Sequence, residues 1–527
     1  MELKYIYNKI DIKELLVFAL TTVLLLSGLI ESPIYIKDEA KNAQCAREMY
    51  QRNDWLIPTF NERLRSDKPP FPYFAMHISY KIFGVNPFAS RFFSAIFGLL
   101  TLILIYFTTK KYLNKETALI SVALLASSMH FLFEFRMAVP DPYLIFFMTA
   151  TLINYFLYVQ YNQWKWILLC ALTAAAGFLS KGPIALILPL CSIIIWSLWD
   201  RKINYFFSYK TLLSGILSIC LIVPWFLKIH QATNGLYTHD FFITNNINRF
   251  NDSMEGHNGS AFYIVLFVLV GMFPATLFIE YPIRNIFNKS IPSLLKLSLT
   301  SCLIIIGFFC FSSTKLPNYP IPAYPFLAIC VAYGIQQTNG IILKNYLWVI
   351  LILITTIIPV SVYSISSKLS DPLGLKYWIY PMLLLPLGLL SLWILTIVRT
   401  SRWTLYCVFL CFICSNYYFF NFVYPKFLNQ NPVSKTSDYW SPQEQLYAYQ
   451  LYNSGFNYYL DKKVLILQDS NSLYNTLMED PTRKVISRLK LYENLDTSKF
   501  ILLTSHQDLF ESPTTVIFKM KNNICQK

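Results

Sequence analysis

The sequence predicts an all-α integral membrane protein with about thirteen transmembrane helices and a small α/β domain at its C-terminal end. Of its 527 residues, 55% are hydrophobic and 14% are charged, whereas about a quarter of the residues of a soluble domain are charged. Apolar runs long enough to cross roughly 30 Å of hydrocarbon recur from residue 14 to residue 424. These two observations exclude a soluble globular protein.

Each apolar run of about 20 residues is expected to form one helix that crosses the membrane. The expected spans are residues 14–34, 88–108, 116–134, 141–160, 164–180, 183–199, 211–229, 261–281, 294–313, 320–336, 345–366, 377–398 and 403–424. Lys4, Lys9 and Lys13 precede the first run, and no small-residue cleavage site follows it. This pattern predicts an uncleaved first helix rather than a signal peptide.

The distribution of Lys and Arg predicts a cytoplasmic N-terminus, because short cytoplasmic loops carry an excess of both residues. With that orientation the cytoplasmic connections contain Lys110, Lys111, Lys115, Lys165, Arg201, Lys202, Lys210, Arg284, Lys289, Lys296, Lys344, Arg399 and Arg402. The reverse orientation would leave mostly single basic residues there, such as Arg136. The positive-inside bias therefore accounts for the formal net charge of +15, and we predict no nucleic-acid partner.

An odd number of spans places the C-terminus on the outer face. Residues 1–428 are expected to form the transmembrane domain and residues 429–527 a separate α/β domain on that face, with strands that begin near Lys463 and Lys499. Two further outer segments, 35–87 and 230–260, are too long to be simple connectors. Within the first, residues 38–52 and 72–83 have helical composition with mixed faces, which predicts juxtamembrane helices in the interface plane.

Acidic and cationic residues recur at the outer ends of the predicted spans. The candidate site residues on this face are Asp38, Glu39, Asp67, Lys68, Asp141, Lys181, Arg249, His257, Lys315 and Tyr319. Each also has an ordinary explanation, since carboxylates cap helices, lysines snorkel at membrane edges and tyrosines populate the aromatic belt. Taken as a set on one face, they favour a functional site.

The chemistry that suits this set is group transfer from a lipid phosphate at the membrane surface. Lys and Arg stabilise the charge that develops on a departing phosphate, and a Tyr hydroxyl donates a further hydrogen bond. A carboxylate opposite them can orient the acceptor or remove its proton.

Several motifs occur in an order that resembles a known family. They are Asp38-Glu-Ala40, Ala46-Arg-Glu-Met49, Asn53-Asp-Trp-Leu-Ile-Pro58, Lys68-Pro-Pro70, Phe83-Gly-Val85, Pro140-Asp141, Lys181-Gly-Pro183 and Lys315-Leu-Pro-Asn-Tyr319. In this order the series resembles the aminoarabinose transferase branch of the dolichyl-phosphate-mannose-protein mannosyltransferase superfamily. The resemblance covers residues 1 to about 330 by motif and the remainder by architecture.

The resemblance implies a GT-C fold and an inverting glycosyltransferase that uses a polyprenyl (undecaprenyl) phosphate-sugar donor. By position, Asp38 and Asp141 resemble the family's critical aspartates, and Lys68, Arg249 and Tyr319 resemble the group that holds the donor phosphate. Glu39, Asp67, Lys181, His257 and Lys315 are further expected binding residues.

The resemblance does not carry over the family's metal site. Asn246 stands at a position that is His in the lipid A enzyme. The sequence therefore assigns no cofactor, and a divalent metal stays an open alternative.

The predicted function is transfer of an aminoarabinose-like or other sugar to lipid A, a glycan or another periplasmic acceptor. The predicted location is the bacterial inner membrane, in contact with membrane lipids and as a monomer. The alternatives are a transporter or flippase of lipid-linked sugars, a protein O-mannosyltransferase-like enzyme and an O-antigen ligase-like enzyme. A transporter would place binding groups near the midplane on repeated, broken helices.

Overall fold

The computed structural model describes residues 11–248, 259–280, 291–337, 344–368, 379–398, 403–441, 443–510 and 512–521. The chain divides into two compact units. Unit 1 comprises Met1–Ser27, Ser66–Pro72 and Arg91–Phe420, and unit 2 comprises Gly28–Arg65, Tyr73–Ser90 and Asn421–Lys527. Most of the first long loop thus belongs to the same unit as the C-terminal domain, an association that the sequence analysis did not anticipate.

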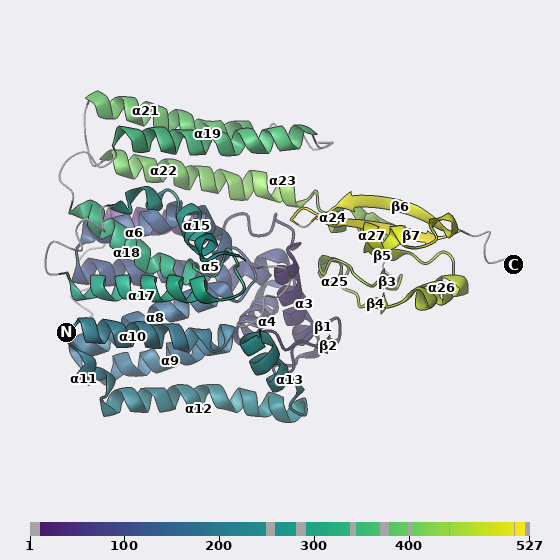
Figure 1. The fold of residues 1–527 in the computed structure, drawn as a ribbon, viewed down its shortest axis with the longest axis horizontal. Helices are drawn as coiled ribbons and strands as arrows, with labels where there is room; N and C mark the ends of the chain where they lie inside the picture. The colour runs from purple at the N-terminus through teal and green to yellow at the C-terminus, as the bar shows by residue number, and fades with distance from the viewer. Residues whose placement is uncertain are drawn as a thin grey trace. The chain divides into compact units, whose positions relative to one another are not determined.

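Unit 1 consists of helices. They are α2 (Ile12–Leu26), α5 (Pro87–Tyr112), α6 (Lys115–Ser127), α7 (Met129–Phe135), α8 (Asp141–Tyr161), α9 (Trp164–Lys181), α10 (Ile184–Trp199), α11 (Ile203–Phe206), α12 (Tyr209–Ala232), α13 (Leu236–His239), η1 (Asp240–Asn248), α15 (Ala261–Gly271), η2 (Ala275–Phe278), α17 (Ser293–Phe311), η3 (Ile321–Ala323), α18 (Tyr324–Gln336), α19 (Asn345–Lys368), η4 (Tyr380–Leu383), α21 (Leu384–Val398) and α22 (Trp403–Tyr418). Neighbouring helices pack in the order α12, α9, α8, α10, α17, α18, α6, α22, α21 and α19. Figure 1 shows these helices lying alongside one another.

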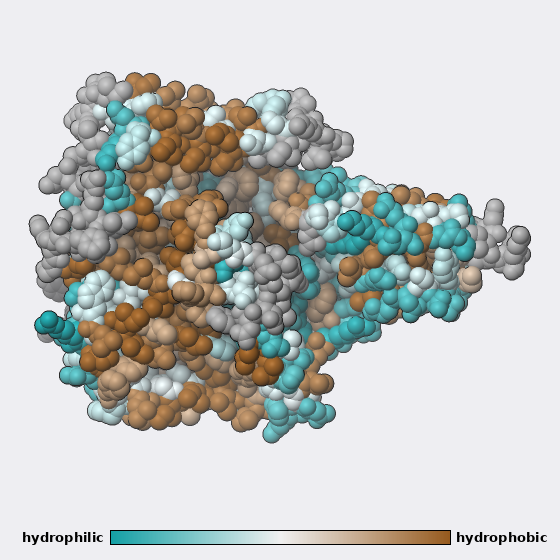
Figure 2. All heavy atoms as spheres, in the orientation of Figure 1, coloured by the Kyte–Doolittle hydropathy of each residue, from teal (hydrophilic) through white to brown (hydrophobic). Residues whose placement is uncertain are grey.

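Helix α8 lies at the centre of this arrangement. Its most apolar 18-residue window is 94% buried, whereas the corresponding window of α12 is 28% buried. On α12 the large apolar side chains Leu212, Ile219 and Leu227 are exposed. Figure 2 shows that the visible surface of the unit 1 helices is mostly apolar, whereas polar side chains predominate over the C-terminal part of unit 2. An apolar exterior is expected for helices that face lipid.

Every predicted span coincides with a helix in the described residues. Among the described residues, five helices are long and apolar enough to cross a membrane, and six are if a bent pair counts as one span. Several of the others are shorter than predicted; α2, for example, ends at Leu26 rather than near residue 34. The number of helices that cross the membrane stays a prediction.

The bent pair is α6 and α7, within the predicted span 116–134. The two helices meet at 74° around Ser128. The Ser128 hydroxyl accepts from the backbone N–H of Phe131 at 3.1 Å and donates to the carbonyl of Gly271 at 2.7 Å. Asn416 donates to the freed carbonyl of Ser127 at 2.9 Å. The side chain of Ser128 at the break and that of Asn416 on α22 therefore satisfy backbone groups that the break releases.

Unit 2 contains the predicted juxtamembrane helices, a short hairpin and a five-stranded sheet. From the first long loop come α3 (Lys37–Arg52), β1 (Thr59–Phe60), β2 (Arg63–Leu64) and the main part of α4 (Phe71–Phe83); from the C-terminal part come α23 (Tyr424–Leu428), α24 (Pro432–Thr436), β3 (Leu446–Tyr449), α25 (Gly455–Leu460), β4 (Val464–Leu467), α26 (Ser470–Glu479), β5 (Val485–Arg488), α27 (Leu489–Glu493), β6 (Phe500–Gln507) and β7 (Thr514–Met520). The sheet order is β4-β3-β5-β7-β6, with β3 parallel to β4 and β5, and β7 antiparallel to β5 and β6.

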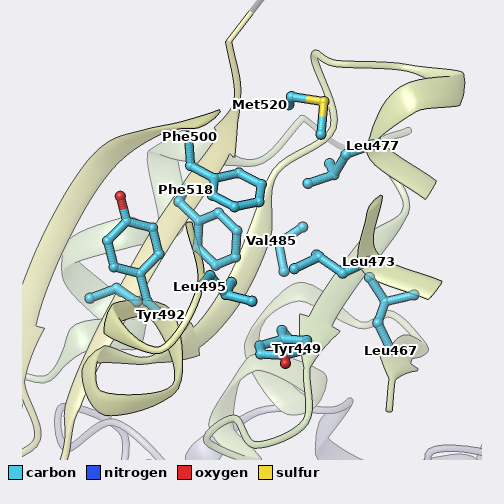
Figure 3. Close-up of a cluster of buried hydrophobic side chains, with 11 residues drawn as sticks. Tyr449, Leu467, Leu473, Leu477, Val485, Tyr492, Leu495, Phe500, Phe518 and Met520 are labelled. Atoms are coloured by element: carbon cyan, nitrogen blue, oxygen red, sulfur yellow. The ribbon is translucent and has the colours of Figure 1, made fainter. Parts of the chain in front are cut away.

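The C-terminal sheet has a hydrophobic core of its own (Figure 3). Leu473 and Leu477 of α26 pack against Val485 of β5 and the rings of Phe500 and Phe518 from β6 and β7. This core confirms the predicted small α/β domain. Strands β4 and β6 begin where the sequence predicted them.

Asn61 connects the two sequence segments of unit 2. It lies in the β1–β2 turn with φ of 55°, and its amide donates to the carbonyl of Val464 at 2.9 Å and accepts from the Val464 N–H at 2.8 Å. Its side-chain oxygen also accepts from Asn457 at 3.0 Å. A buried amide whose donor and acceptor groups are both used fixes the hairpin against β4.

Candidate active site

The site begins with the hairpin of α8 and α9. Helix α8 starts at Asp141, and α9 runs back alongside it and ends at Lys181. The carboxylate thus lies at the positive end of one helix dipole and the ammonium at the negative end of the other, which favours both charges. The antiparallel pairing brings together two residues that are 40 positions apart in the sequence.

The Asp141 carboxylate is buried and hydrogen-bonded through one oxygen. The side chain of Lys181 donates to Oδ1 at 2.5 Å, and the Asn318 amide donates to the same oxygen at 3.1 Å. In the part of the chain that the structure describes, no protein donor contacts Oδ2 of Asp141. Since Asp141 is only 5% exposed, these two donors replace most of the water that an isolated carboxylate would need.

Tyr319 lies beside this ion pair. The Lys181 ammonium is 5.7 Å from the centroid of the Tyr319 ring, within the range of a cation–π contact. The Tyr319 ring also packs against Phe309 of α17, with centroids 4.7 Å apart. Asp141, Lys181 and Tyr319, which the sequence analysis proposed separately, therefore form one cluster in unit 1.

Lys315, four residues before Tyr319, binds the end of a helix. Its ammonium donates to the carbonyl of Cys310 at 3.1 Å and to that of Ser312. These carbonyls belong to the C-terminal end of α17, where a cation is favourable. These two contacts favour a structural role for Lys315 at the end of α17.

The Lys68 segment is attached to the same region. The hydroxyl of the buried Tyr237 donates to the Lys68 carbonyl at 2.7 Å. Three residues later, Phe71 packs edge-on against Tyr143 and Phe147 on the first turns of α8, at centroid distances of 5.7 and 5.0 Å. The chain around Lys68 is therefore held at the end of α8 where Asp141 lies.

The π-helix η1 approaches the site at Gly182, directly after Lys181. Gly182 has φ of 89°, and a Cβ there would lie 2.8 Å from the ring of Phe241. Only glycine combines this backbone conformation with such a close contact. Phe241 also stacks on Tyr237 at 6.1 Å, which links the Lys68 contact to the Lys181 contact.

The described residues do not fit a metal site. Asn246 donates its amide to the carbonyl of Phe241 at 2.6 Å. Among the described residues, no group of three or more His, Cys, Asp or Glu side chains is placed to hold a metal ion. Amide and carbonyl groups without such side chains nearby are weak ligands for transition metals.

The remaining candidates come from other segments of the chain. Asp38 and Glu39 lie in the first turn of α3 in unit 2, where Asp38 is exposed and Glu39 is buried. Asp67 lies beside Lys68 and is half-buried. Arg249 and His257 lie outside the described residues.

Sequence reasoning missed Asn318, Tyr237 and Phe241. Asn318 was visible as part of the motif that ends at Tyr319, and its position next to a proposed ligand was the available signal. Nothing in the local sequence around Tyr237 or Phe241 distinguishes them from other aromatic residues of the loop.

Comparison with known proteins identifies the family. Residues 40–237 match the family described as dolichyl-phosphate-mannose-protein mannosyltransferase. A protein of Aquifex aeolicus, described only as uncharacterized, is 30% identical over 304 residues, which cover 57% of this chain and 68% of that one. This chain belongs to the dolichyl-phosphate-mannose-protein mannosyltransferase superfamily. As a member of this superfamily, it is a glycosyltransferase.

Named relatives within the superfamily are bacterial arabinosyl transferases. The undecaprenyl phosphate-α-4-amino-4-deoxy-L-arabinose arabinosyl transferase of Pectobacterium carotovorum is 29% identical over 329 residues, covering 61% of this chain and 58% of that enzyme. A second, from Proteus mirabilis, is 28% identical over 385 residues, covering 69% of this chain and 66% of that enzyme. The chain thus matches less than two thirds of the length of each of these two enzymes.

The fold is that of a superfamily member of known structure. ArnT from Cupriavidus metallidurans, crystallised with undecaprenyl phosphate, superimposes with a TM-score of 0.76 at 17% identity, covering 96% of this chain and 97% of that one. This likeness confirms the GT-C fold that the sequence motifs implied.

Proposed function

We propose that this chain transfers a sugar from undecaprenyl phosphate to lipid A or another acceptor at the periplasmic face of the bacterial inner membrane. The observation that carries the proposal is the cluster of Asp141, Lys181 and Tyr319 beside the Lys68 segment. It supplies a carboxylate and cations at one end of the helices, in a chain whose named relatives act on undecaprenyl phosphate-aminoarabinose.

In the proposed reaction the acceptor attacks the anomeric carbon of the sugar and the phosphate of the donor departs, with inversion. Lys68, Tyr319 and Arg249 are proposed to hold the departing phosphate, because cationic groups and a phenol stabilise the charge that it gains in the transition state. The Tyr319 ring is already fixed by Phe309, so its hydroxyl loses little freedom when it binds.

The aspartates are proposed to act on the acceptor side. Asp141, ion-paired with Lys181, can orient the acceptor or the sugar through its second oxygen. If the acceptor is a hydroxyl, Asp38 or Asp141 would remove its proton; if it is the ionised phosphate of lipid A, no base is needed.

The charge distribution of unit 1 supports a periplasmic site. Helix α8 has 21 residues and is therefore roughly 31 Å long, with Asp141 at one end. At the other end, the Lys210 ammonium donates to the carbonyl of Asn162 at 2.9 Å. Lys210, one of the basic residues of the predicted cytoplasmic loops, therefore lies about one membrane thickness away from Asp141. This separation agrees with a basic cytoplasmic face and a catalytic site on the outer face.

The proposal is tested with purified protein in lipid nanodiscs. Undecaprenyl monophosphate-linked aminoarabinose and the corresponding diphosphate-linked sugar are each incubated with lipid A, and the products are identified by mass spectrometry. We expect transfer from the monophosphate donor and a loss of about 100-fold or more in kcat for Lys68→Ala, the scale for one contact to a developing charge. Lys81→Ala is the control, because Lys81 lies on α4 within unit 2 and packs over the ring of Trp55.

Other outcomes identify the alternatives. Transfer from the diphosphate donor alone would indicate a ligase-like enzyme. Movement of the intact donor between leaflets without a glycosylated product would indicate a flippase. Near-normal transfer by Lys68→Ala would contradict the phosphate assignment.

A further inference from the structure

We infer that Asn318 is a positioning residue that selects which oxygen of Asp141 faces the reacting groups. The inference rests on the proposed function. Its geometric basis is that Asn318 and Lys181 both donate to Oδ1 of Asp141, at 3.1 and 2.5 Å. With Oδ1 occupied twice, Oδ2 is the oxygen left to meet the acceptor or the sugar.

The backbone around Asn318 is stiff. Pro317 and Pro320 fix two φ angles, and Tyr319 is restricted further because it precedes a proline. The Tyr319 N–H donates to the carbonyl of Leu316 at 3.2 Å, and the Ile321 N–H donates to that of Asn318 at 3.3 Å. The Asn318 amide is therefore presented from a pre-formed turn, at a small cost in conformational entropy.

The two donors to Asp141 have different effects. Lys181 brings a positive charge, which balances the buried carboxylate. Asn318 donates a directional hydrogen bond to Asp141 but adds no charge, because its amide is neutral. A second cation at this place would add another charged group for the departing phosphate to bind, and a carboxylate would repel both Asp141 and the phosphate. An amide is the group that orients Asp141 and leaves the charge of the site unchanged.

The same turn connects the acceptor side to the phosphate side. Asn318 contacts Asp141, whereas the next residue, Tyr319, is the proposed phosphate ligand beside Lys181. A shift of the turn would therefore move both groups together. This coupling explains why adjacent residues of one short motif should bear on the two ends of the reaction.

The first test is the kinetics of Asn318→Ala in nanodiscs, with the undecaprenyl phosphate-aminoarabinose donor. A hydrogen bond to a charged group is lost, and kcat should fall by about ten- to a hundredfold. Because Tyr319 and Lys68 are unchanged, KM for the donor should change by less than about threefold. A kcat within twofold of wild type would overturn the inference.

The second test is the pH profile of Asn318→Asp, which a merely structural role would not alter. At low pH the two carboxyl groups share a proton, so Asp in place of Asn318 can donate to Asp141 and activity should approach that of wild type. As pH rises and both carboxyl groups ionise, their repulsion should lower the activity of Asn318→Asp but not that of wild type. The neutral Asn318→Ala should show no recovery at low pH. A profile of Asn318→Asp parallel to wild type would overturn the inference.

The control and a second readout separate this inference from the proposed function. Asn345→Asp, at the exposed start of α19, should keep the wild-type profile. The Tm of Asn318→Asp should likewise fall with rising pH relative to Asn318→Ala, a readout that needs no substrate. A wild-type protein that is inactive with the monophosphate donor would overturn the proposed function, whereas a pH-independent Tm difference would overturn the Asn318 contact alone.

Discussion

At the scale of the residue, the Asp141–Lys181 pair shows how a charge is kept in a largely apolar unit. Asp141 is 5% exposed, and an isolated carboxylate at that burial would be strongly unfavourable. The ion pair offsets this cost of burying the Asp141 charge only while both partners are present. Removal of one partner is therefore more harmful than removal of both.

This asymmetry predicts the outcome of a double-mutant cycle. Lys181→Met keeps an apolar stem and should lower the free energy of unfolding by about 1.5–3 kcal/mol, the range for hydrogen bonds to charged groups. Asp141→Asn in the same chain should restore part of that loss, because it removes the unpaired charge. Equilibrium unfolding in mixed micelles measures both, and additive effects would contradict the pairing.

Gly182 supports a second prediction at this scale. Gly182→Ala places a Cβ at φ of 89° and 2.8 Å from the Phe241 ring, so stability should fall by about 1–3 kcal/mol and transfer should fall as Lys181 shifts. Gly215→Ala in α12 is the matched control, since a Cβ there meets nothing within 4 Å. That control should be neutral or stabilising by about 0.5–1 kcal/mol. Equal losses in the two variants would contradict the role of the Gly182 backbone.

His77 on α4 predicts a pH dependence of unit 2. Its ring stacks on Trp55 at 4.0 Å, and both ring nitrogens are buried without a hydrogen-bond partner in the described structure. Burial lowers the pKa of His77, and the charge of Lys81 lowers it further. As pH falls, the His77 ring is protonated in the unfolded chain before it is protonated in the folded chain. The free energy of unfolding should therefore decrease as pH falls below about 6.5.

The measurement is the pH dependence of unfolding for wild type and His77→Phe. The variant keeps an aromatic ring and should have a smaller loss of stability between pH 7 and pH 5. Since burial also lowers the pKa of His506, the variant should retain part of the dependence. Identical slopes for the two proteins would exclude His77 as a source.

At the scale of the element, the ends of the helices in unit 1 are closed by side chains from other helices. Arg136 donates to the carbonyls of Leu24 and Ser27 at 2.6 Å each, at the C-terminal end of α2. Asn416 of α22 serves the carbonyl of Ser127 at the break between α6 and α7. Away from water, a helix end needs such partners.

Asn416→Leu tests this requirement. It leaves the Ser127 carbonyl unpaired and should lower the free energy of unfolding by about 1–3 kcal/mol, the penalty for a buried unsatisfied group. Ser415→Ala, half-buried on the same helix, is the control and should change stability by less than about 0.5 kcal/mol. An Asn416 variant as stable as this control would show that another group replaces the amide.

At the scale of the whole molecule, unit 2 is assembled from segments about 400 residues apart in the chain. Arg47 of α3 forms an ion pair with Asp461 at 2.5 Å and donates to the carbonyl of Tyr458 at 2.9 Å. Asn61 adds the hydrogen bonds to Val464. The stability of the C-terminal domain therefore depends on the first long loop.

Asn61→Ala should weaken the attachment of the first long loop to the C-terminal domain. It removes three side-chain hydrogen bonds and introduces a residue less suited to φ of 55°. We expect cleavage of the C-terminal domain by a protease to become at least about fivefold faster, which corresponds to roughly 1 kcal/mol of local opening. The exposed Asn494→Ala should not change that rate, and equal rates for both variants would contradict the link.

The sequence by itself determined the positions of the helices, the small α/β domain and the family. Apolar runs and ordered motifs are local properties, so neither depends on how the chain packs. They placed Asp141, Lys181 and Tyr319 at the ends of predicted spans on one face of the membrane.

Only the tertiary structure decided which of these ends meet. The contact of Asn318 with Asp141 joins residues 177 positions apart, and the break at Ser128 is completed by Gly271 and Asn416. The ion pair of Arg47 with Asp461 likewise joins residues that are far apart in the sequence. Hydrophobic periodicity carries no information on such pairings, because they depend on the packing of helices and strands whose exposed faces look alike in sequence.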